Sequence, residues 1–280
     1  MRGSEKQVGS KNGDRVPVIR FVNLTIFPEL FFPFWEHGII RKAIDQKTIS
    51  VSAVNIRDFA EDRHQTTDDR PYGGGCGMVM KPEPLAAAIR YAQNESPDSK
   101  TILLTPQGQV FNQKIALKFG SEKGLILVCG RYEGVDERIC SDFIDHEISV
   151  GDYVLTGGEL GAMIIIDAIT RLIPGSLGGA DSAERDSFSD DLLEHAHYTR
   201  PRTFEGESVP EVLLSGNHQD IAKWRLETAL IRTFLKRKDL LKDRILTKQE
   251  SYILKKWCFE IEEIIRFQSL RGPAALSGNQ

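Results

Sequence analysis

Short apolar runs alternate with amphipathic stretches over the first 175 residues of the chain. The runs rich in β-branched and aromatic residues predict strands at 18–25, 48–54, 101–104, 125–128 and 147–150. Apolar residues at helical spacing predict helices at 35–45, 84–93 and 113–119, and a buried helix at 159–172. Strands that alternate with helices predict an α/β domain whose mostly parallel sheet is covered on both faces.

The C-terminal part of the chain has a different pattern. Helical spacing at 218–236 and 248–265 predicts a small helical domain, and the first of these stretches places Ile221, Trp224, Ile231 and Leu235 on one apolar face. A segment rich in Gly, Ser and Asp separates this part from the α/β domain and is typical of a linker.

These patterns predict five regions. They are a disordered extension at 1–17, an α/β domain at 18–175, a flexible linker at 176–185, a helical domain at 186–266 and a frayed tail at 267–280. The first region is polar and glycine-rich and has no apolar stretch of the kind that a signal peptide needs. Inside the α/β domain, residues 57–80 are rich in loop formers, which is typical of a functional or a disordered segment.

The net charge of −4 does not indicate a nucleic-acid-binding protein, but the distribution of charge is uneven. Residues 215–256 contain eleven Lys and Arg against five Asp and Glu, whereas residues 181–194 contain six acids and one Arg. The basic segment predicts a local phosphate-binding face. A solvated helix surface is an equally good interpretation of the charges alone.

Cysteine usage and hydropathy bear on location. The four cysteines form no CxxC pair, which favours a reducing compartment, and we expect a cytoplasmic protein. No stretch approaches the roughly 18 apolar residues of a transmembrane helix, so no membrane association is expected.

Two glycine-centred stretches have the most informative pattern. In LILVCGRYEGVDE (125–137) and GDYVLTGGEL (151–160), an apolar run is followed by glycines and acidic residues. Glycine lets the backbone approach a ligand closely, so two such loops at strand ends predict one small-molecule site, with ordinary tight turns as the alternative. Neither stretch is a GxGxxG or GxxxxGK[ST] phosphate loop.

Further motifs occur along the chain in a fixed order. They are IFPELF (26–31), RDF and DRH (57–64), DDRPYGGG (68–75), GMVM (77–80), TPQG (105–108), LVCGRYEGVDER (127–138), VGDYVLTGGEL (150–160), RLIPG (171–175), DSF (186–188), HYTRP (197–201) and VLLSGNH (212–218). With them, the chain resembles the bacterial TrmD-type tRNA (guanine-N1)-methyltransferases of the SPOUT superfamily from about residue 18 to about residue 257.

The resemblance implies a fold and an activity. It implies a deep trefoil knot formed by the segments around 130–136 and 150–160, which periodicity cannot predict because chains rarely thread loops. It implies methyl transfer from S-adenosylmethionine to N1 of guanine 37 of tRNA by a homodimer whose active site is shared between subunits. It also suggests a requirement for Mg²⁺, without assigned ligands.

The motifs that match the family imply a set of cofactor-binding residues. These residues are Pro106, Gly108, Gly130, Tyr132, Glu133, Val150, Gly151, Asp152, Tyr153, Val154, Leu155, Gly157 and Gly158. A plain turn is the alternative for the Pro-Gln-Gly stretch, and loop solvation is the alternative for Tyr132 and Glu133.

Two residues match the family's catalytic positions. Asp186 would remove the proton from N1 of guanine, and Arg171 would stabilise the negative charge that develops toward O6. From the sequence alone, Asp186 is also a good N-cap for a following helix, and Arg171 is also suited to the C-terminal end of a helix dipole.

A third set is expected at the tRNA. We expect tRNA contacts from Asp68, Asp69, Arg70, His197, Arg200, Lys223 and Arg225, with solvated surface charges as the alternative for Asp68 to Arg70. The HxH pair at His195 and His197 is not expected to bind zinc.

Three functions therefore compete. The first is the guanine-37 methyltransferase, the second is an RNA-binding protein with a decayed cofactor site, and the third is a SPOUT methyltransferase with another tRNA or rRNA target. The intact glycines and the presence of both Arg171 and Asp186 disfavour decay, and the DSF and HYTRP motifs favour the first function over the third.

Overall fold

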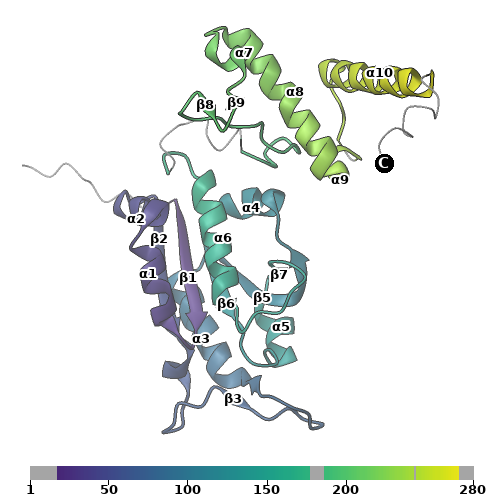
Figure 1. Cartoon of the computed structure of the whole chain (residues 1–280). Coiled ribbons are helices and arrows are strands. Elements are labelled where there is room, and N and C mark those ends of the chain that lie inside the picture. The colour runs from purple at the N-terminus through teal and green to yellow at the C-terminus, as the bar shows by residue number, and fades with distance from the viewer. Residues whose placement is uncertain (1–17, 177–185, 243, 271–280) are drawn as a thin grey trace, which may run out of the picture. The chain divides into compact units, whose positions relative to one another are not determined.

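The computed structural model describes residues 18–176, 186–242 and 244–270, and its N-terminal part is built around a five-stranded sheet (Figure 1). All neighbouring strands are parallel, and their order is β2-β1-β6-β5-β7. The strands are β1 (Ile19–Thr25), β2 (Ile49–Asn55), β5 (Ser99–Val110), β6 (Gly124–Cys129) and β7 (His146–Ser149). Because a parallel strand is covered on both faces, β6 is buried along its whole length. The predicted α/β class with a parallel sheet is confirmed.

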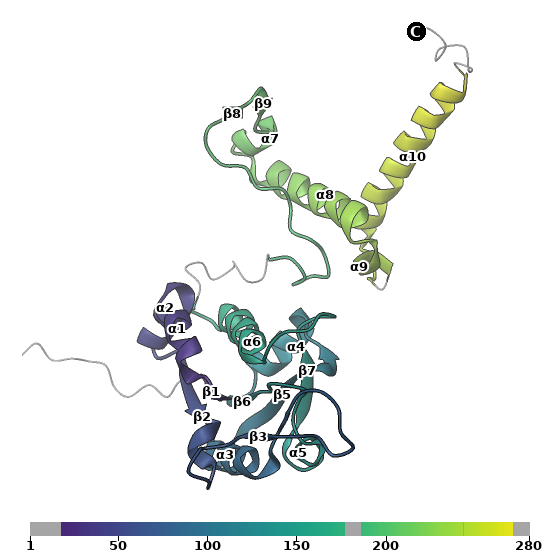
Figure 2. The same ribbon diagram turned by 60° about the horizontal axis from the view of Figure 1, so that its bottom comes forward.

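Helices cover both faces of this sheet (Figure 2). One face packs against α2 (Gly38–Asp45), α4 (Gln113–Gly120) and α6 (Glu159–Leu172). The other face packs against α3 (Pro82–Glu95) and α5 (Glu137–Phe143). Alternate residues of β6 belong to the two cores, as the two-residue period of a strand requires.

The connections between β1 and α3 are short or irregular. A 3₁₀ turn, η1 (Pro28–Phe31), and a single helical turn, α1 (Phe32–Trp35), follow β1. The glycine-rich stretch after β2 contains η2 (Ile56–Phe59) and a two-stranded antiparallel pair, β3 (Asp68–Asp69) with β4 (Val79–Met80).

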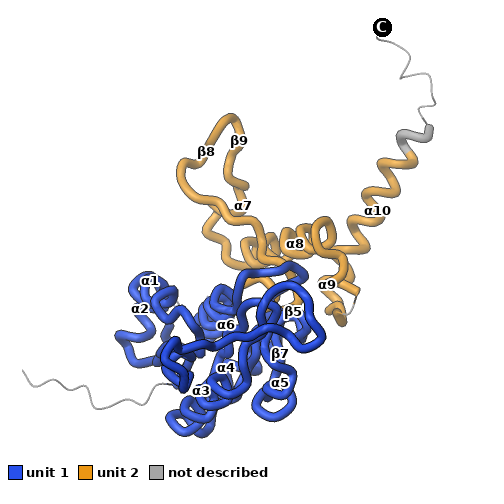
Figure 3. Tube along the Cα trace, turned by 90° about the horizontal axis from the view of Figure 1, so that it is seen from below, with its two compact units in different colours: residues 1–180 blue, residues 181–280 orange. Residues whose placement is uncertain are grey.

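The chain divides into two compact units, residues 1–180 and residues 181–280 (Figure 3). The second unit contains a hairpin, β8 (Thr203–Phe204) with β9 (Glu207–Ser208), and four described helices. The helices are α7 (Glu211–Leu214), α8 (His218–Lys236), α9 (Lys238–Lys242) and α10 (Lys248–Leu270). Asn217 caps α8 by accepting hydrogen bonds from the N–H groups of Gln219 and Asp220.

The structure corrects several predictions. Helix α5 was not predicted, and β5 extends well beyond the expected 101–104. The buried residues of α8 are Leu230 and Thr233, whereas Leu235, which we expected on the buried face, is 68% exposed. Helix α10 continues to Leu270, beyond the end that we predicted at residue 265.

Parts of the predicted regions lie outside the described residues. They include the extension at 1–17, residues 177–185 of the predicted linker and residues 271–280 of the predicted tail. Within the described ranges, no helix combines the length and the apolar character needed to cross a bilayer.

Candidate active site

A cavity of about 320 Å³ lies at the carboxyl ends of β6 and β7 and beside the irregular middle part of β5. In the sheet, β6, β5 and β7 are adjacent, and the segments that follow β6 and β7 are the two glycine-centred stretches. The cavity is lined by parts of 103–107, 130–137, 147–151 and 153–161. Ligands of parallel α/β sheets bind at this edge because the loops there meet.

Most of the predicted cofactor residues line this one cavity. They are Pro106, Gly130, Tyr132, Glu133, Val150, Gly151, Tyr153, Val154, Leu155, Gly157 and Gly158. Two of the predicted residues, Gly108 and Asp152, are not among the residues that line it. The sequence-based expectation that both glycine-centred stretches border one pocket therefore agrees with the geometry.

The two stretches are held directly against each other. The N–H of Gly158 donates a hydrogen bond to the carbonyl of Gly130 at 2.9 Å, and Arg131 forms an isolated antiparallel bridge with Gly157. A Cβ at Gly158 would lie 2.7 Å from Cα of Cys129 and 3.0 Å from Cβ of Leu104. The absence of a side chain at Gly158 is thus what permits this approach.

Gly108 lies directly against the backbone of β7. A Cβ there would lie 2.4 Å from the backbone of both Glu147 and Ile148. It occupies the irregular part of β5, where Leu104 and Gln109 both pair with Ile148. The alternative of a plain turn for Pro106–Gly108 is wrong, because these residues lie within β5, at the point where its register against β7 shifts.

The turn after β7 is fixed by its own backbone and by Tyr153. Gly151 has φ +144, and its N–H donates to Oγ of Ser149. The hydroxyl of Tyr153 donates to the carbonyl of Val150 at 3.0 Å. A Cβ at Gly151 would lie 2.5 Å from the Tyr153 ring, so only glycine suits both the φ value and the packing.

A polar network that the sequence did not predict joins the two stretches to β1, and one of its members, Arg131, lines the cavity. Nη2 of Arg131 lies 2.9 Å from Oε2 of Glu159, whose side chain is 2% exposed. Thr25 Oγ1 donates to Oε1 of the same carboxylate at 2.6 Å. The Arg131 guanidinium also lies over the Phe27 ring. In the sequence, the only sign of a buried ion pair was the acidic Glu159 at the start of the otherwise apolar helix α6.

The segment 68–80 is attached to the loop after β6. The N–H of Met80 donates to the carbonyl of Gly134 at 2.9 Å, and the N–H of Glu133 donates to the carbonyl of Met78 at 3.0 Å. Gly77, at φ +86, leaves room for the Glu133 side chain. The predicted substrate residues Asp68, Asp69 and Arg70 are thus on β3 and just after it, beside β4, and none of them lines the cavity.

The two predicted catalytic residues belong to different units. Arg171 lies in the last turn of α6 and is half-buried. Asp186 is half-buried in a turn of the second unit, and its carbonyl accepts a hydrogen bond from Ser189 N–H. The alternative that Asp186 caps a helix is wrong, because residues 186–197 contain none.

The second unit contains an aromatic cluster formed by His195, His197, Tyr198 and Trp224. The rings of His195 and His197 are 4.4 Å apart, and Trp224 of α8 lies 6.4 Å from His195 and 6.2 Å from Tyr198. Nε2 of His197 lies 2.8 Å from Oε1 of Glu194. Burial lowers the pKa of His195 below its usual 6.5.

The predicted tRNA-binding cations are close in sequence to members of this cluster. Arg200, Lys223 and Arg225 are exposed, and Arg225 is close enough to His195 to help lower its pKa. A surface that combines exposed rings with cations can stack unpaired bases and contact phosphates.

The chain matches one family over most of its length. The family described as tRNA (Guanine-1)-methyltransferase TrmD matches residues 19–243. The chain is 54% identical over 262 residues to the tRNA (guanine-N(1)-)-methyltransferase of Desulfatibacillum aliphaticivorans, covering 94% of this chain and 100% of that protein. It is 52% identical to the enzymes of that name from Carboxydothermus hydrogenoformans, covering 86% of this chain and 95% of the relative, and from Dictyoglomus turgidum, covering 88% and 99%.

Proposed function

Because this chain belongs to the TrmD family of tRNA (guanine-1)-methyltransferases, we propose that it methylates N1 of guanine 37 in tRNA, with S-adenosylmethionine as methyl donor. The observation that carries the proposal is the convergence of both glycine-centred stretches on one cavity at the edge of a parallel sheet. We further propose that the chain between 130 and 160 is threaded as the family's trefoil knot.

The cavity suits the proposed methyl donor. Its volume of about 320 Å³ is in the range of small-molecule sites, which start at about 300 Å³. Its walls offer backbone N–H and C=O groups of the glycine-centred stretches, the Glu133 carboxylate, and apolar contacts from Val154 and Leu155. Polar groups beside apolar side chains can hold a nucleoside, and S-adenosylmethionine, when bound there, supplies an electrophilic methyl group.

Two side chains of this protein would perform the proton chemistry. N1 of neutral guanine carries a proton, so its lone pair is unavailable until a base removes that proton. We assign this task to the Asp186 carboxylate and assign Arg171 to the negative charge that then develops toward O6. Magnesium is a further proposed requirement. Among the described residues no group of three or more His, Cys, Asp and Glu is arranged for a metal, and we assign it no ligands.

We propose that tRNA contacts both units. Asp68, Asp69 and Arg70 would meet the target guanine, while His197, Arg200, Lys223 and Arg225 would contact the rest of the tRNA. We also propose a homodimer in which Asp186 of one subunit acts on a guanine beside the cofactor of the other. We also propose that the reaction takes place in the cytoplasm, where a tRNA substrate is available.

A methylation assay tests the target. Transcribed tRNAs with guanine or with another base at position 37 are incubated with labelled S-adenosylmethionine, and we expect label only in the first. Equal labelling of both would indicate another target in tRNA, and labelling of rRNA instead would place the protein among other SPOUT methyltransferases.

Asp186→Asn tests the base. The amide keeps the size of the side chain but does not accept the proton, so we expect a rate loss of at least about 10²-fold with cofactor and tRNA affinities within a few-fold of wild type. Heterodimers of an Asp186→Asn chain and a Gly151→Val chain test the shared site. One competent site per heterodimer is expected, and no recovery in assembled heterodimers would contradict the sharing.

A further inference from the structure

The segment that carries Asp186 has no regular secondary structure, and two of its residues have an unfavourable backbone conformation. Phe188 and Asp191 have φ values of 73 and 51, a left-handed region that residues with a side chain rarely occupy. The turn closes through Phe188 N–H, which donates to the carbonyl of Leu192 at 2.8 Å, and through Ser187 Oγ, which accepts from Glu194 N–H. Such conformations persist only where surrounding contacts fix them.

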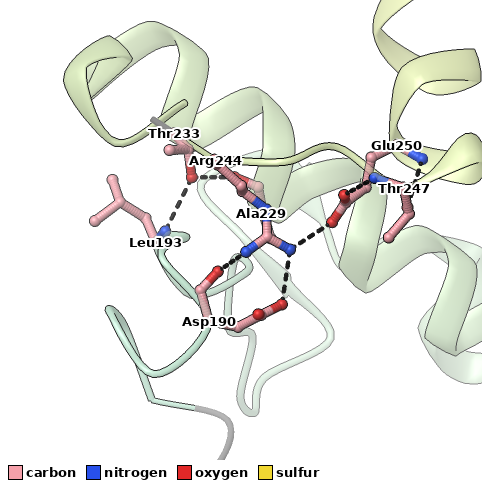
Figure 4. Close-up of polar contacts among 7 residues, drawn as sticks. All are labelled: Asp190, Leu193, Ala229, Thr233, Arg244, Thr247 and Glu250. Carbon is pink, nitrogen blue, oxygen red and sulfur yellow. Dashed lines mark hydrogen bonds and ion pairs between the residues drawn. The ribbon is translucent and has the colours of Figure 1, made fainter. Parts of the chain in front are cut away.

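The helices of the second unit supply those contacts. Leu192 is buried in a small core with Leu230 of α8 and Ile253 of α10. The N–H of Leu193 donates to Oγ1 of Thr233 at 2.9 Å (Figure 4).

Arg244 makes the strongest of these attachments (Figure 4). Its guanidinium donates to the backbone carbonyl of Asp190, to Oδ2 of Asp190 at 2.8 Å, and to Oε1 of Glu250 at 2.7 Å. Its side chain is only 10% exposed. One planar guanidinium therefore serves three acceptors, an arrangement that a lysine ammonium does not reproduce.

The third acceptor is itself fixed at the start of α10. Oε2 of Glu250 accepts from Thr247 N–H at 2.8 Å, and Thr247 Oγ1 accepts from Glu250 N–H at 3.2 Å. This is a capping box, which fixes the carboxylate while stabilising the helix start. Burial alone would raise the pKa of Glu250, but its hydrogen bonds from Thr247 and Arg244 lower it, so the carboxylate stays charged opposite Arg244.

We propose that Arg244 is a positioning residue of the methyl-transfer reaction. It fastens the Asp186–Glu194 segment to the capped start of α10, so that the Asp186 carboxylate is presented by a rigid part of the helical unit. This inference rests on the proposed role of Asp186 as the base. The short separation of Asp186 from Asp190 in sequence means that a shift of the attachment moves the base, and a misplacement of about 1 Å can cost about 10²-fold in rate.

Arg244→Lys tests the proposal in the full-length protein, because it keeps the charge and removes the fork. The amplitude of single-turnover methyl transfer gives the number of active sites. We expect kcat per active site of the Arg244→Lys variant to fall about 10- to 100-fold. The KM for S-adenosylmethionine should stay unchanged, since the cavity is in the other unit. A purely structural role would reduce the number of active sites and leave kcat per site unchanged, which would overturn the proposal. Arg202→Lys, which alters an exposed ion pair of the same unit, is the matched control.

A double variant separates this inference from the proposed function. If Arg244 acts only through Asp186, Asp186→Asn combined with Arg244→Lys should be no slower than Asp186→Asn alone, whereas independent effects would multiply and contradict the proposal. A wild-type rate for Asp186→Asn would refute the base itself. A slow Asp186→Asn beside a normal Arg244→Lys would refute only the role of Arg244. Should Arg244→Lys not fold, Asp190→Ala, at an exposed carboxylate, decides by the same kcat and double-variant criteria.

Discussion

Arg131 and Glu159 form an ion pair behind the candidate active site, with Nη2 and Oε2 2.9 Å apart and side chains that are 17% and 2% exposed. The pair joins the loop after β6 to the first turn of α6. Because Thr25 also donates to this carboxylate, β1, the loop and the helix are held at one point. The position of both glycine-centred stretches therefore depends on an ion pair of which Arg131 lines the cavity and Glu159 does not.

Replacement of Arg131 should show how much the ion pair with Glu159 contributes to stability. In Arg131→Met, the Glu159 carboxylate stays buried without its cation, and we expect the first unit to lose about 3 kcal/mol of unfolding free energy in urea titrations. Arg41→Met breaks an exposed pair with Asp45 and should cost at most about 0.5 kcal/mol. The double variant Arg131→Met with Glu159→Gln should lose less than the sum of the two single variants, and full additivity would show that the pair is not coupled.

Because the two glycine-centred stretches touch at Gly158, adding a single methyl group there should affect both stability and cofactor binding. In Gly158→Ala, the new Cβ would meet Cα of Cys129 at 2.7 Å, and the backbone must move apart. We expect a loss of about 1–3 kcal/mol in stability together with weaker binding of S-adenosylmethionine in calorimetry.

Gly120→Ala is the matched control for that change. Its Cβ would have only Cγ2 of Ile169 nearby, at 3.8 Å, and the residue ends α4. It should bind the cofactor normally and be at least as stable as wild type. Equal behaviour of the two variants would mean that the contact between Gly158 and Gly130 does not shape the cavity.

Because the pKa of His195 is lowered, we expect the stability of the helical unit to depend on pH. Burial lowers the pKa of His195 below 6.5, so the unfolded chain takes up the proton at a higher pH than the folded chain does. Between the two pKa values the unfolded state binds more protons, and stability therefore rises with pH in that window. Acidification from pH 6.5 downward should lower the melting temperature of this unit, and His195→Gln should reduce that dependence. An unaltered pH dependence would assign it to other groups.

The sequence predicted the regular parts of the fold because local patterns determine them. Helix α6 has the predicted bounds, since an apolar run followed by Pro174 and Gly175 leaves little choice, and the buried parallel strands are continuous apolar runs. Helix α5 was missed because its seven residues are too few to establish a period and include charged Glu137, Arg138 and Asp142.

The candidate site was predictable only in part. Glycines at strand ends indicated the loops, and the cavity borders both of them. The contacts of Glu159 join residues 28 and 134 positions away, and no local pattern reports such pairings. The attachment of Asp190 by Arg244 spans 54 positions and was missed for the same reason.

Two exposed cations of α8 predict the salt dependence of tRNA binding. Lys223 and Arg225 are exposed on α8 beside the aromatic cluster of His195, Tyr198 and Trp224. If each contacts a phosphate, its replacement by Gln should weaken binding about equally for all tRNAs and reduce the slope of log K against log salt by roughly one unit or less. The double replacement should approach twice the effect of one. Lys123→Gln, which breaks an exposed pair with Asp98 in the other unit, is the control and should leave the slope unchanged. Filter binding at several salt concentrations measures the slopes, and an unchanged slope in the double variant would place the tRNA on another surface.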